Sequence, residues 1–497
     1  MVGASYLLLL LLAASCIYLP YLLLMYTNIM QVQVILLFLA GIVVASTVLW
    51  SLLPRRDKFD PAGVILDRST HLRLFREVDE IAEALREQAP DEIYLIGQPN
   101  AFVTDLSGTL GFGRRRIMGI GLPLFPILTV SELRAVLAHE FGHFYSGDTS
   151  LGPWVYRARS VLMRSFQSMG NLQEFGVIHA LRVLAVLAGL AIAKYFSFFL
   201  RVISFVSRKQ EYRADELACL IAGKKAAIRG LEKVHGAGPF WDWYWTVEVA
   251  PIIGCNYIPD IGEGFRRFLA DTSIAEFVDK GIVEERKSAN ASRLDTHPPL
   301  GRRIAAMEQV QAEDSSPDDA LALSLFDQPP LTELMFVEKT NPQIPKGTLQ
   351  HVAWENVGSC VTIPYWRSQV SAFGGLLMGK KAGALPDLLK VLPEIASRLP
   401  DPKGTLLTPL QRRHKACQLL GMAVSLLLLD KGWKLYTQPA VFHLRRNGDT
   451  LNAFQVVNDL EAGKLTPESW AQKCFELGIK DQTLDGTGAQ PIPVSSP

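Results

Sequence analysis

The chain has 497 residues, and its 50 Lys and Arg nearly balance its 49 Asp and Glu, giving a net charge of +1. This balance gives no support for a nucleic-acid partner, and the length suits about two or three domains. Hydrophobic residues make up 49% and charged residues 20%, which excludes a disordered or collagen-like chain. The six cysteines lie far apart without a C-x-x-C pair, so their spacing excludes a zinc knuckle and favours a reducing compartment.

Two apolar segments at the start of the chain, residues 5–25 and 33–53, contain no Asp, Glu, Lys or Arg. Each has the ~20 residues needed to cross ~30 Å of hydrocarbon, so we expect a transmembrane hairpin over residues 1–53. Three basic residues follow the second segment directly: Arg55, Arg56 and Lys58. Because basic flanks stay in the cytoplasm, both termini are expected there. A lipoprotein signal ending near Cys16 is the alternative, but no basic residue precedes the first segment and a second span follows at once.

A third apolar stretch, residues 177–207, is interrupted by four polar residues. They are His179, Arg182, Lys194 and Arg201. The uncharged run between Arg182 and Lys194 has 11 residues, which is too short to span a membrane. We therefore expect the stretch not to cross as a single helix, but to form a bent hairpin or a helix against the membrane or the core. Residues 154–169 mix arginines with apolar side chains, a pattern typical of a helix on the bilayer surface and equally of a solvated helix.

The segment before the first chemical motif predicts a helix and a small sheet. Apolar residues at three- and four-residue steps favour a helix over residues 72–85. Short stretches bounded by glycines favour strands at 93–96, 100–103 and 116–120. We expect these elements to form a scaffold for the residues that follow.

An H-E-x-x-H motif at residues 139–143 carries the first chemistry. Residues 129–132 have the form of a capping box, and the apolar period behind them runs into the motif, which places it on a helix. Four-residue spacing puts His139 and His143 on one face, where both imidazoles can bind one Zn²⁺ while Glu140 turns toward water. This arrangement is typical of a metallopeptidase. Gly142 inside the helix indicates the close approach of another element.

A catalytic zinc ion needs a third protein ligand and an open position. Glu211 is the candidate ligand, and Asp215, one turn later on the same face, can accept a hydrogen bond from the non-metal nitrogen of a ligand histidine. Taken alone, two such carboxylates are more typical of a charged helix surface. Their combination with the upstream motif favours a metal site, which Co²⁺ or Mn²⁺ could also occupy.

Four motifs follow one another along the chain. They are Asn100-Ala101-Phe102, the H-E-x-x-H motif, the segment from Arg208 to Asp215, and Thr296-His297-Pro298-Pro299 followed by Arg302 and Arg303. In these motifs residues 57–307, together with the amino-terminal hairpin, resemble the integral-membrane gluzincin peptidases that include the HtpX heat-shock membrane protease and the CAAX prenyl protease. The resemblance implies a membrane-anchored, mainly α fold with a small β-sheet and a zincin-type catalytic core.

The resemblance also implies residue roles. It makes His139, His143 and Glu211 the ligands of one Zn²⁺ per chain, Glu140 the general base, and Asp215 a support for the ligands. It implies an edge strand that binds the backbone of an extended polypeptide substrate, formed by Asn100, Ala101, Phe102 and Val103.

The same resemblance places His297 near the site, as a donor to the oxyanion of the transition state. A lone histidine before two prolines is, however, more often a loop residue. One departure concerns topology, because relatives such as HtpX carry two further spans between the motif helix and the third ligand. Here the 67 residues between His143 and Glu211 hold only the interrupted stretch. Since both ligands must meet at one ion, the chain between them can cross the bilayer only an even number of times.

The rest of the chain predicts an accessory domain without a site. We expect five parts: a transmembrane hairpin at 1–53, a metallopeptidase domain at 54–310, a linker at 311–346, an α+β domain at 347–480 and a disordered tail at 481–497. Within the α+β domain we expect a buried helix around 417–429, a hairpin turn at Asn447-Gly448 and a final helix from Thr466 to Gly478. The aromatic residues of 240–246 fit a packed core, a cleft lining or a lipid interface.

The sequence therefore predicts a membrane-bound zinc endopeptidase that acts on extended polypeptides, with its catalytic domain on the cytoplasmic side of a bacterial inner membrane. Protein quality control or processing is the expected role, by resemblance. The alternative is a catalytically silent membrane scaffold or binding module that retains the fold. The presence of every expected ligand and of the general base disfavours that alternative.

Overall fold

The computed structural model describes residues 2–26, 32–53, 63–106, 115–145, 152–175, 179–288, 297–312, 318–400 and 407–485. Two compact units result: unit 1 is Met1–Gly238 with Val278–Asp327, and unit 2 is Pro239–Phe277 with Gln328–Pro497. This division differs from the expected domain boundaries, because residues 239–277 group with the carboxy-terminal part. The short helix η3 (Gly238–Phe240) and α12 (Thr272–Lys287) straddle the division.

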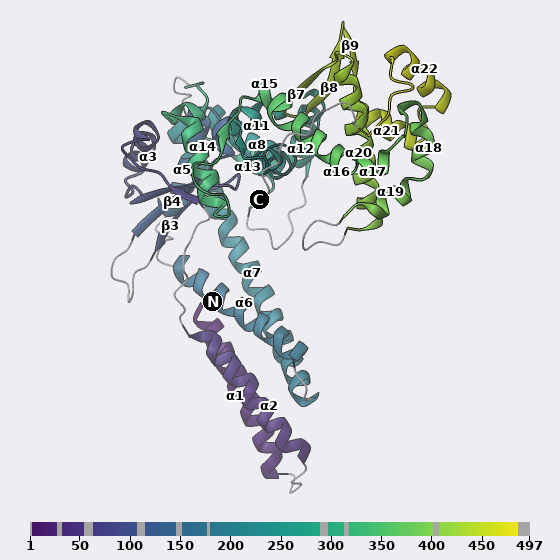
Figure 1. The fold of residues 1–497 in the computed structure, drawn as a ribbon. Helices are drawn as coiled ribbons and strands as arrows, with labels where there is room; N and C mark the ends of the chain where they lie inside the picture. The colour runs from purple at the N-terminus through teal and green to yellow at the C-terminus, as the bar shows by residue number, and fades with distance from the viewer. Residues whose placement is uncertain are drawn as a thin grey trace. The chain divides into compact units, whose positions relative to one another are not determined.

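Unit 1 begins with a hairpin of two apolar helices, α1 (Val2–Tyr26) and α2 (Val32–Leu52), drawn in purple in Figure 1. Both are long and apolar enough to cross a membrane, as predicted. The helices pack tightly where Gly41 faces Cys16, since a Cβ at Gly41 would lie 2.0 Å from the Cys16 carbonyl oxygen. The absence of a side chain at Gly41 therefore lets the two backbones approach.

A second helical hairpin, α6 (Gly152–Phe175) and α7 (His179–Ala222), packs beside the first (Figure 1). α7 is one continuous helix of 44 residues, so of the two forms expected for residues 177–207 the bent hairpin is wrong for the described part. The other form, a helix packed against its neighbours, is present, since α7 contacts α1, α2 and α6. The placement of the charges explains the continuity: Arg182, Lys194 and Arg201 are exposed, while apolar residues at helical spacing form the packed face. By length and composition, α7 is a third candidate membrane span.

The four helices share an apolar core. It consists of Leu9, Ala13 and Cys16 from α1, Val44, Ala45 and Val48 from α2, Ala158, Val161, Leu162 and Met169 from α6, and Ala188, Ile192 and Phe199 from α7. Two polar contacts cross this core. The Ser5 hydroxyl lies 3.2 Å from the Tyr195 hydroxyl, and the Ser51 and Ser165 hydroxyls form a hydrogen bond. The second hairpin is thereby fixed against the first.

A four-stranded sheet lies above the hairpins in Figure 1, with strand order β1-β2-β4-β3. The strands are β1 (Gly63–Ile65), β2 (Glu92–Ile96), β3 (Ala101–Leu106) and β4 (Arg115–Gly121). β2 and β4 are parallel, whereas β3 pairs antiparallel with β4 and forms one edge. Gly119 lies opposite Phe102, whose ring fills the space that a side chain at Gly119 would need. The predicted strands are confirmed.

Further helices of unit 1 pack near this sheet and α7. They are α3 (Leu72–Ala84), α4 (Leu124–Ile127), α5 (Val130–Tyr145), α8 (Lys224–Ala237), α13 (Leu300–Glu308) and the short η5 (Ala322–Leu325). Of these, α4 and α5 contact the sheet directly. α3 confirms the predicted helix at 72–85. The predicted capping box of α5 is also confirmed, because Thr129 N donates to Glu132 Oε2 at 2.9 Å and Glu132 N donates to Thr129 Oγ1 at 3.3 Å.

The first segment of unit 2 is Pro239–Phe277. It contains α9 (Trp241–Tyr244), η4 (Trp245–Val249), α10 (Ala250–Gly254), β5 (Tyr257–Ile258) and α11 (Ile261–Leu269). Trp241 and Tyr244 are buried and pack against Phe265 and Phe268, so the packed-core interpretation of residues 240–246 is supported for these two side chains. Glu333 closes the start of α11, accepting hydrogen bonds from Ile261 N at 2.7 Å and Gly262 N at 2.8 Å.

The remainder of unit 2 is mostly helical. Its elements are α14 (Pro329–Thr340), β6 (Gln350–His351), α15 (Trp354–Val357), η6 (Gly358–Thr362), α16 (Ile363–Ala372), α17 (Gly374–Leu377), η7 (Ala382–Ala384), α18 (Leu385–Lys390), α19 (Leu392–Arg398), α20 (Pro409–Asp430), β7 (Lys434–Gln438), β8 (Val441–Arg446), β9 (Asp449–Leu451), α21 (Ala453–Glu461) and α22 (Pro467–Leu477). β6 pairs in parallel with β5, and β7, β8 and β9 form an antiparallel sheet.

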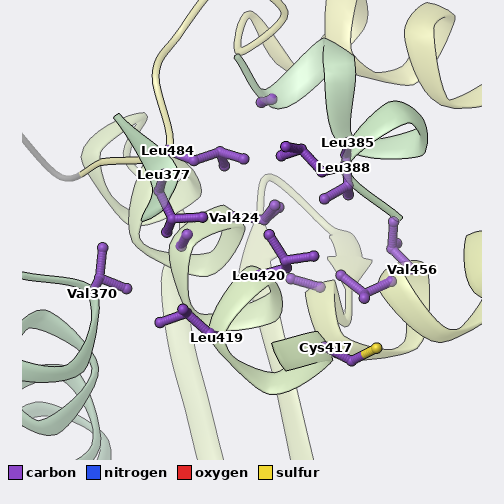
Figure 2. Close-up of a cluster of buried hydrophobic side chains, with 14 of the residues drawn as sticks. Val370, Leu377, Leu385, Leu388, Cys417, Leu419, Leu420, Val424, Val456 and Leu484 are labelled. Atoms are coloured by element: carbon purple, nitrogen blue, oxygen red, sulfur yellow. The ribbon is translucent and has the colours of Figure 1, made fainter. Parts of the chain in front are cut away.

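The core of unit 2 gathers around α20, the helix predicted at 417–429 (Figure 2). Leu420 and Val424 of α20 pack against Leu385 and Val456 from neighbouring helices. The predicted turn between β8 and β9 is confirmed, with Asn447 at φ +52° and Gly448 at φ +94°. The expected linker contains α14, and residues 481–485 are ordered, because Leu484 is buried in this core.

Candidate metal centre

α5 and α7 cross each other at Gly142 and Ala214, and this crossing brings the predicted ligands together. A Cβ at Gly142 would lie 2.9 Å from the Ala214 Cα and 3.3 Å from Leu217 Cδ1, closer than side chains normally pack. The predicted close approach at Gly142 is therefore present. Glycine costs about 1 kcal/mol in a helix interior relative to alanine, and here it allows α7 to place Glu211 beside the H-E-x-x-H motif.

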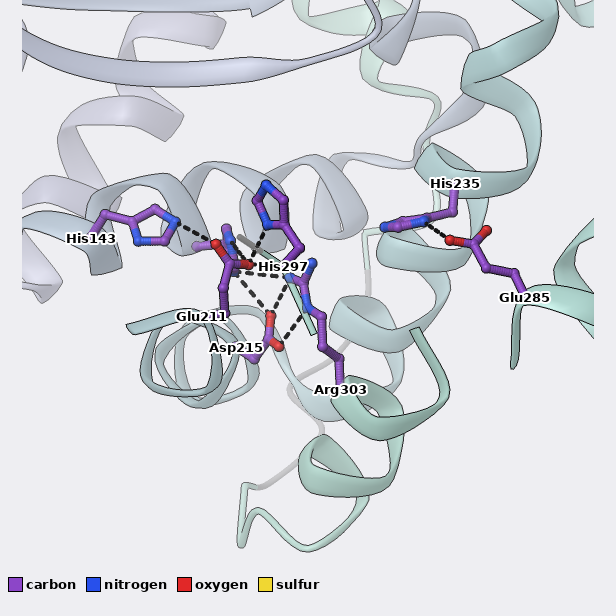
Figure 3. Close-up of polar contacts among 8 residues, drawn as sticks. His143, Glu211, Asp215, His235, Glu285, His297 and Arg303 are labelled. Atoms are coloured by element: carbon purple, nitrogen blue, oxygen red, sulfur yellow. Dashed lines mark hydrogen bonds and ion pairs between the residues drawn. The ribbon is translucent and has the colours of Figure 1, made fainter. Parts of the chain in front are cut away.

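The three predicted ligands lie close together, and Figure 3 shows the imidazoles of His143 and His297 pointing toward the Glu211 carboxylate from two sides. Nε2 of His139 lies 3.6 Å from Glu211 Oε2, and Nε2 of His143 lies 3.7 Å from Glu211 Oε1. The two imidazole rings of α5 have centroids 4.9 Å apart. Ligand atoms of His139, Glu140 and His143 all lie within 4.8 Å of one another.

These residues fit a bound divalent metal ion. Glu211 is 2% exposed, and its Oε2 lies 2.9 Å from His297 Nδ1 and 3.4 Å from Arg303 Nη1. Ligands at ~2.0–2.2 Å from a tetrahedral zinc ion stand roughly 3.3–3.5 Å from one another. The observed separations of 3.6 and 3.7 Å are close to that value. A buried carboxylate that faces His139 and His143 at these separations fits a cation held between the three ligand side chains.

A second layer of charge fixes the orientation of His139. Asp215 Oδ1 lies 3.0 Å from His139 Nδ1, so a proton on Nδ1 leaves Nε2 free to face Glu211. Arg303 of α13 holds Asp215 with two hydrogen bonds, from Nε at 2.9 Å and from Nη2 at 2.7 Å. Arg303 Nη1 also lies 3.4 Å from Glu211 Oε2. The sequence reasoning included Arg303 in a motif but gave it no role, because its distance of 88 residues from Asp215 hides the contact.

The surroundings shift the pKa values of the motif residues. Burial raises the pKa of Glu140 to about 7, with the Glu211 charge adding to the effect and His139 opposing it. Burial lowers the pKa of His143 to about 4, helped by the nearby His139. His143 is therefore a neutral imidazole at neutral pH, which is the form that binds metal. Because its pKa is close to neutral pH, Glu140 can both accept and release a proton there.

Glu211 and Asp215, the α7 carboxylates at the site, stay ionised. Both lie beyond Arg208 and Lys209, after the apolar part of the helix. Burial alone would raise the pKa of Asp215, but the hydrogen bonds with Arg303 and His139 hold it well below its usual range. Burial also opposes ionisation of Glu211, yet close contact with His297 and the charges of His139 and Arg303 lower its pKa overall.

His297 reaches the same carboxylate from a separate segment. Its Nδ1 lies 2.9 Å from Glu211 Oε2, and its side chain is 63% exposed. The contact with Glu211 raises the pKa of His297. Thr296, the residue before it in the predicted motif, lies outside the described residues. The structure thus brings His297 to the site, while its role as an oxyanion donor stays a prediction.

The predicted substrate strand also lies beside the site. β3 is the edge of the sheet and contacts α5. Ala101 and Val103 are buried, Phe102 covers Gly119, and Asn100 precedes the strand with its Oδ1 accepting from Ala101 N at 2.9 Å. An edge strand leaves one row of backbone N–H and C=O groups without a strand partner.

The start of α5 is tied to α8, which stiffens the motif helix. Glu132 is 1% exposed, and its carboxylate accepts from Lys233 Nζ at 2.7 Å in addition to Thr129 N. Arg229 Nε lies 3.4 Å from the other oxygen of Glu132. Sequence reasoning found the capping box but missed these partners, since nothing in the local pattern indicates which helix packs there.

A mainly helical chain with apolar helices, a small sheet and this site defines a membrane-anchored metallopeptidase with a zincin-type core. Residues 68–311 match Peptidase family M48. Protease HtpX from Pseudomonas putida (strain W619) is 26% identical over 246 residues, covering 48% of this chain and 70% of that protein. A Protease HtpX homolog from Archaeoglobus fulgidus is 26% identical over 249 residues, covering 48% of this chain and 68% of that protein.

Among solved structures, the crystal structure of S. mikatae Ste24p aligns with a TM-score of 0.28 at 15% identity, over 61% of this chain and 62% of that chain. This chain thus spans about three fifths of the length of that structure. The predicted resemblance to the HtpX-like membrane metallopeptidases is confirmed. Residues 312–497 lie outside the matched family region.

Proposed function

We propose that the protein is a membrane-bound zinc endopeptidase, in which His139, His143 and Glu211 hold one Zn²⁺ per chain. The observation that carries this proposal is the buried Glu211 carboxylate, whose Oε2 faces His139 Nε2 at 3.6 Å and whose Oε1 faces His143 Nε2 at 3.7 Å. A His₂Glu set with an open position suits zinc, which supplies Lewis-acid polarisation of a carbonyl and activation of water.

The chain's own residues perform the proton transfers. Glu140, with its pKa raised to about 7, accepts a proton from the attacking water and passes it to the leaving amine. Asp215 keeps the proton of His139 on Nδ1, so that Nε2 stays a ligand. His297 donates to the oxyanion that develops on the carbonyl oxygen, from the exposed rim of the site.

The substrate is a polypeptide in extended form. It adds as a strand to the free edge of β3, along Asn100, Ala101, Phe102 and Val103. Backbone hydrogen bonds of this kind tolerate many sequences, which suits a protease that acts on unfolded or misfolded chains. Quality control or processing of proteins is therefore the role that we propose, with the names of the relatives as further support.

We place the catalytic unit on the cytoplasmic side of a bacterial inner membrane. The support is the basic sequence directly after α2, because basic flanks remain in the cytoplasm. The absence of a C-x-x-C pair among the six cysteines agrees with a reducing compartment.

The experiment is casein cleavage by the detergent-purified full chain, with zinc content measured on the same samples. We expect one zinc per chain, loss of cleavage on chelation and recovery on adding Zn²⁺. Glu140→Gln should retain zinc but lose roughly 10²–10⁴-fold in rate, because it removes the base and not a ligand. His143→Ala should lose both zinc binding and casein cleavage. A zinc-loaded wild type without cleavage, or a Glu140→Gln variant as active as wild type, would favour the silent scaffold instead.

A further inference from the structure

A hollow on the outer face of α6 is not used by the proposed reaction. It measures about 290 Å³ and is lined by Arg159, Ser160, Met163 and Arg164. Residues 159 and 163, and likewise 160 and 164, are one helical turn apart, so the four side chains share one side of the helix. Because a water molecule occupies ~30 Å³ of liquid, the hollow is large enough for a group of several heavy atoms.

The hollow lies level with one end of the first hairpin. Arg164 Nη2 donates to the Ser51 carbonyl oxygen at 3.3 Å, and Ser165 bonds to the Ser51 hydroxyl. Ser51 is in the last turn of α2, a helix of 21 residues that is apolar enough to span a membrane. The end of such a helix marks the boundary between hydrocarbon and water, where lipid phosphates lie.

Arg159 and Arg164 have N–H donors that are not used by the described residues. The contact with Ser51 is the one hydrogen bond that Arg164 makes to the described residues, although a guanidinium has five N–H groups. Its Nε is buried and has no partner among the described residues. Arg159 is exposed and has no ion-pair partner in the same part of the chain. The sequence of α6 contains one acidic residue, Glu174, ten residues beyond Arg164.

Exposed apolar side chains lie on the same helix ends as the hollow. Met163 is 37% exposed and Phe166 is 44% exposed on α6, and Trp50 on the neighbouring end of α2 is 63% exposed. A partner that has an anionic group and apolar chains matches both parts of this surface. Arginine suits a phosphate in particular, because its planar fork can donate two parallel hydrogen bonds.

We propose that this hollow binds the phosphate of an anionic phospholipid, with Arg164 and Arg159 as cationic donors and the Ser160 hydroxyl as a third donor. The acyl chains lie along Met163, Phe166 and Trp50. Ten residues of the second hairpin, or roughly 15 Å, lie between Ser165 and the end of α6 at Phe175. A lipid held at Arg164 fixes the depth of that hairpin, whose second helix carries Glu211.

The test uses native mass spectrometry of the delipidated full chain in detergent, titrated with phosphatidylglycerol or phosphatidylcholine of the same acyl chains. We expect tighter retention of phosphatidylglycerol. An interfacial arginine is worth about fivefold in affinity for anionic lipid, so Arg159→Gln should weaken binding about fivefold and Arg159→Gln/Arg164→Gln roughly 30-fold. The matched control is Arg201→Gln, which removes the same charge from an exposed position on α7.

The control should bind phosphatidylglycerol as the wild type does, and casein cleavage in detergent should be unchanged in all these variants. Three results would overturn the proposal: equal affinity for the two lipids, equal losses in Arg201→Gln and the double variant, or displacement of the lipid by inorganic phosphate alone. If the double variant does not fold, Arg159→Gln decides, because Arg159 is exposed. Lipid binding is measured without proteolysis, so the outcome is independent of the proposed catalytic function.

Discussion

Gly142 is the residue at which α5 and α7 come closest, and replacing it with alanine should damage the metal site more than the fold. The new Cβ would lie 2.9 Å from the Ala214 Cα, whereas non-bonded carbons prefer ~3.5–4.0 Å. α7 must therefore move by roughly 0.6–1 Å at the crossing. Overpacking of this kind costs about 1–3 kcal/mol, and the better helix propensity of alanine returns about 1 kcal/mol of it.

The net loss in free energy of unfolding is thus about 0–2 kcal/mol for Gly142→Ala. Glu211 lies on α7 within one turn of Ala214, so the same movement reaches the ligand. Metal ligands tolerate displacements of about ±0.2 Å, so we expect zinc affinity to fall at least tenfold. Competition with a chromophoric chelator measures the affinity, and thermal unfolding of the metal-free protein measures the stability.

Gly281→Ala is the matched control for this substitution. Gly281 is exposed on α12, and a Cβ there would meet nothing within 4 Å. Alanine at that position should stabilise the helix by up to about 1 kcal/mol and leave zinc affinity unchanged. If Gly142→Ala bound zinc as tightly as the wild type, the account of the helix crossing would be refuted.

Three further predictions concern charge. Arg303→Met leaves the buried Asp215 carboxylate without its arginine partner, so it should lower the free energy of unfolding by about 3–5 kcal/mol. Arg303→Met/Asp215→Asn should lose less than the sum of the single changes. Cleavage should fall as the pH drops below about 7, because Glu140 has its pKa raised to about 7 and a protonated Glu140 cannot accept a proton. Burial raises the pKa of Glu333 to about 7, above its value in the unfolded chain, so its contribution to the stability of unit 2 is present at acidic pH and lost as the pH rises through 7.

Each of these predictions has its own measurement. Chemical denaturation of the wild type, the two single variants and the double variant gives the coupling free energy between Arg303 and Asp215. Additive losses in the free energy of unfolding would contradict a direct interaction. A pH profile of casein cleavage gives the acidic limb, and a flat profile between pH 5 and pH 8 would contradict the role of Glu140. Glu333→Gln should flatten the dependence of unfolding on pH between about 4.5 and 7, and an unchanged slope would count against the buried carboxylate as its source.

The parts of the fold that depend on local pattern could be predicted. The capping box at Thr129 and Glu132 involves residues three apart, and the hairpin turn at Asn447 and Gly448 requires positive φ at adjacent positions. Both are properties of a few neighbouring residues. The apolar helices α1 and α2 follow from length and composition in the same way.

The parts that depend on distant packing could not be predicted in the same way. The charges of α7 interrupt its apolar pattern in the linear sequence, but Arg182, Lys194 and Arg201 occupy exposed positions once the apolar face packs against α1, α2 and α6. The grouping of residues 239–277 with the carboxy-terminal unit depends on β5 pairing with β6 and on Glu333 closing α11. No local signal indicates either partner.

The candidate site likewise has residues that local spacing predicts and residues that depend on distant packing. Residues 139, 140 and 143 share one helix, so their relative placement follows from helical spacing. Glu211 and His297 were reached by resemblance and by the need for a third ligand, and the structure brings both to the motif. Arg303 was left without a role, because a bidentate contact with Asp215 can be seen only in the folded chain.

X-ray absorption spectroscopy of the zinc-loaded full chain tests the central claim most directly. We expect a first shell of two imidazole nitrogens and one carboxylate oxygen at about 2.0–2.2 Å, with one exchangeable light atom, and a changed shell in Glu211→Ala. A shell with three imidazoles would make His297 a ligand in place of Glu211, and a spectrum that Glu211→Ala leaves unaltered would contradict the metal centre described above.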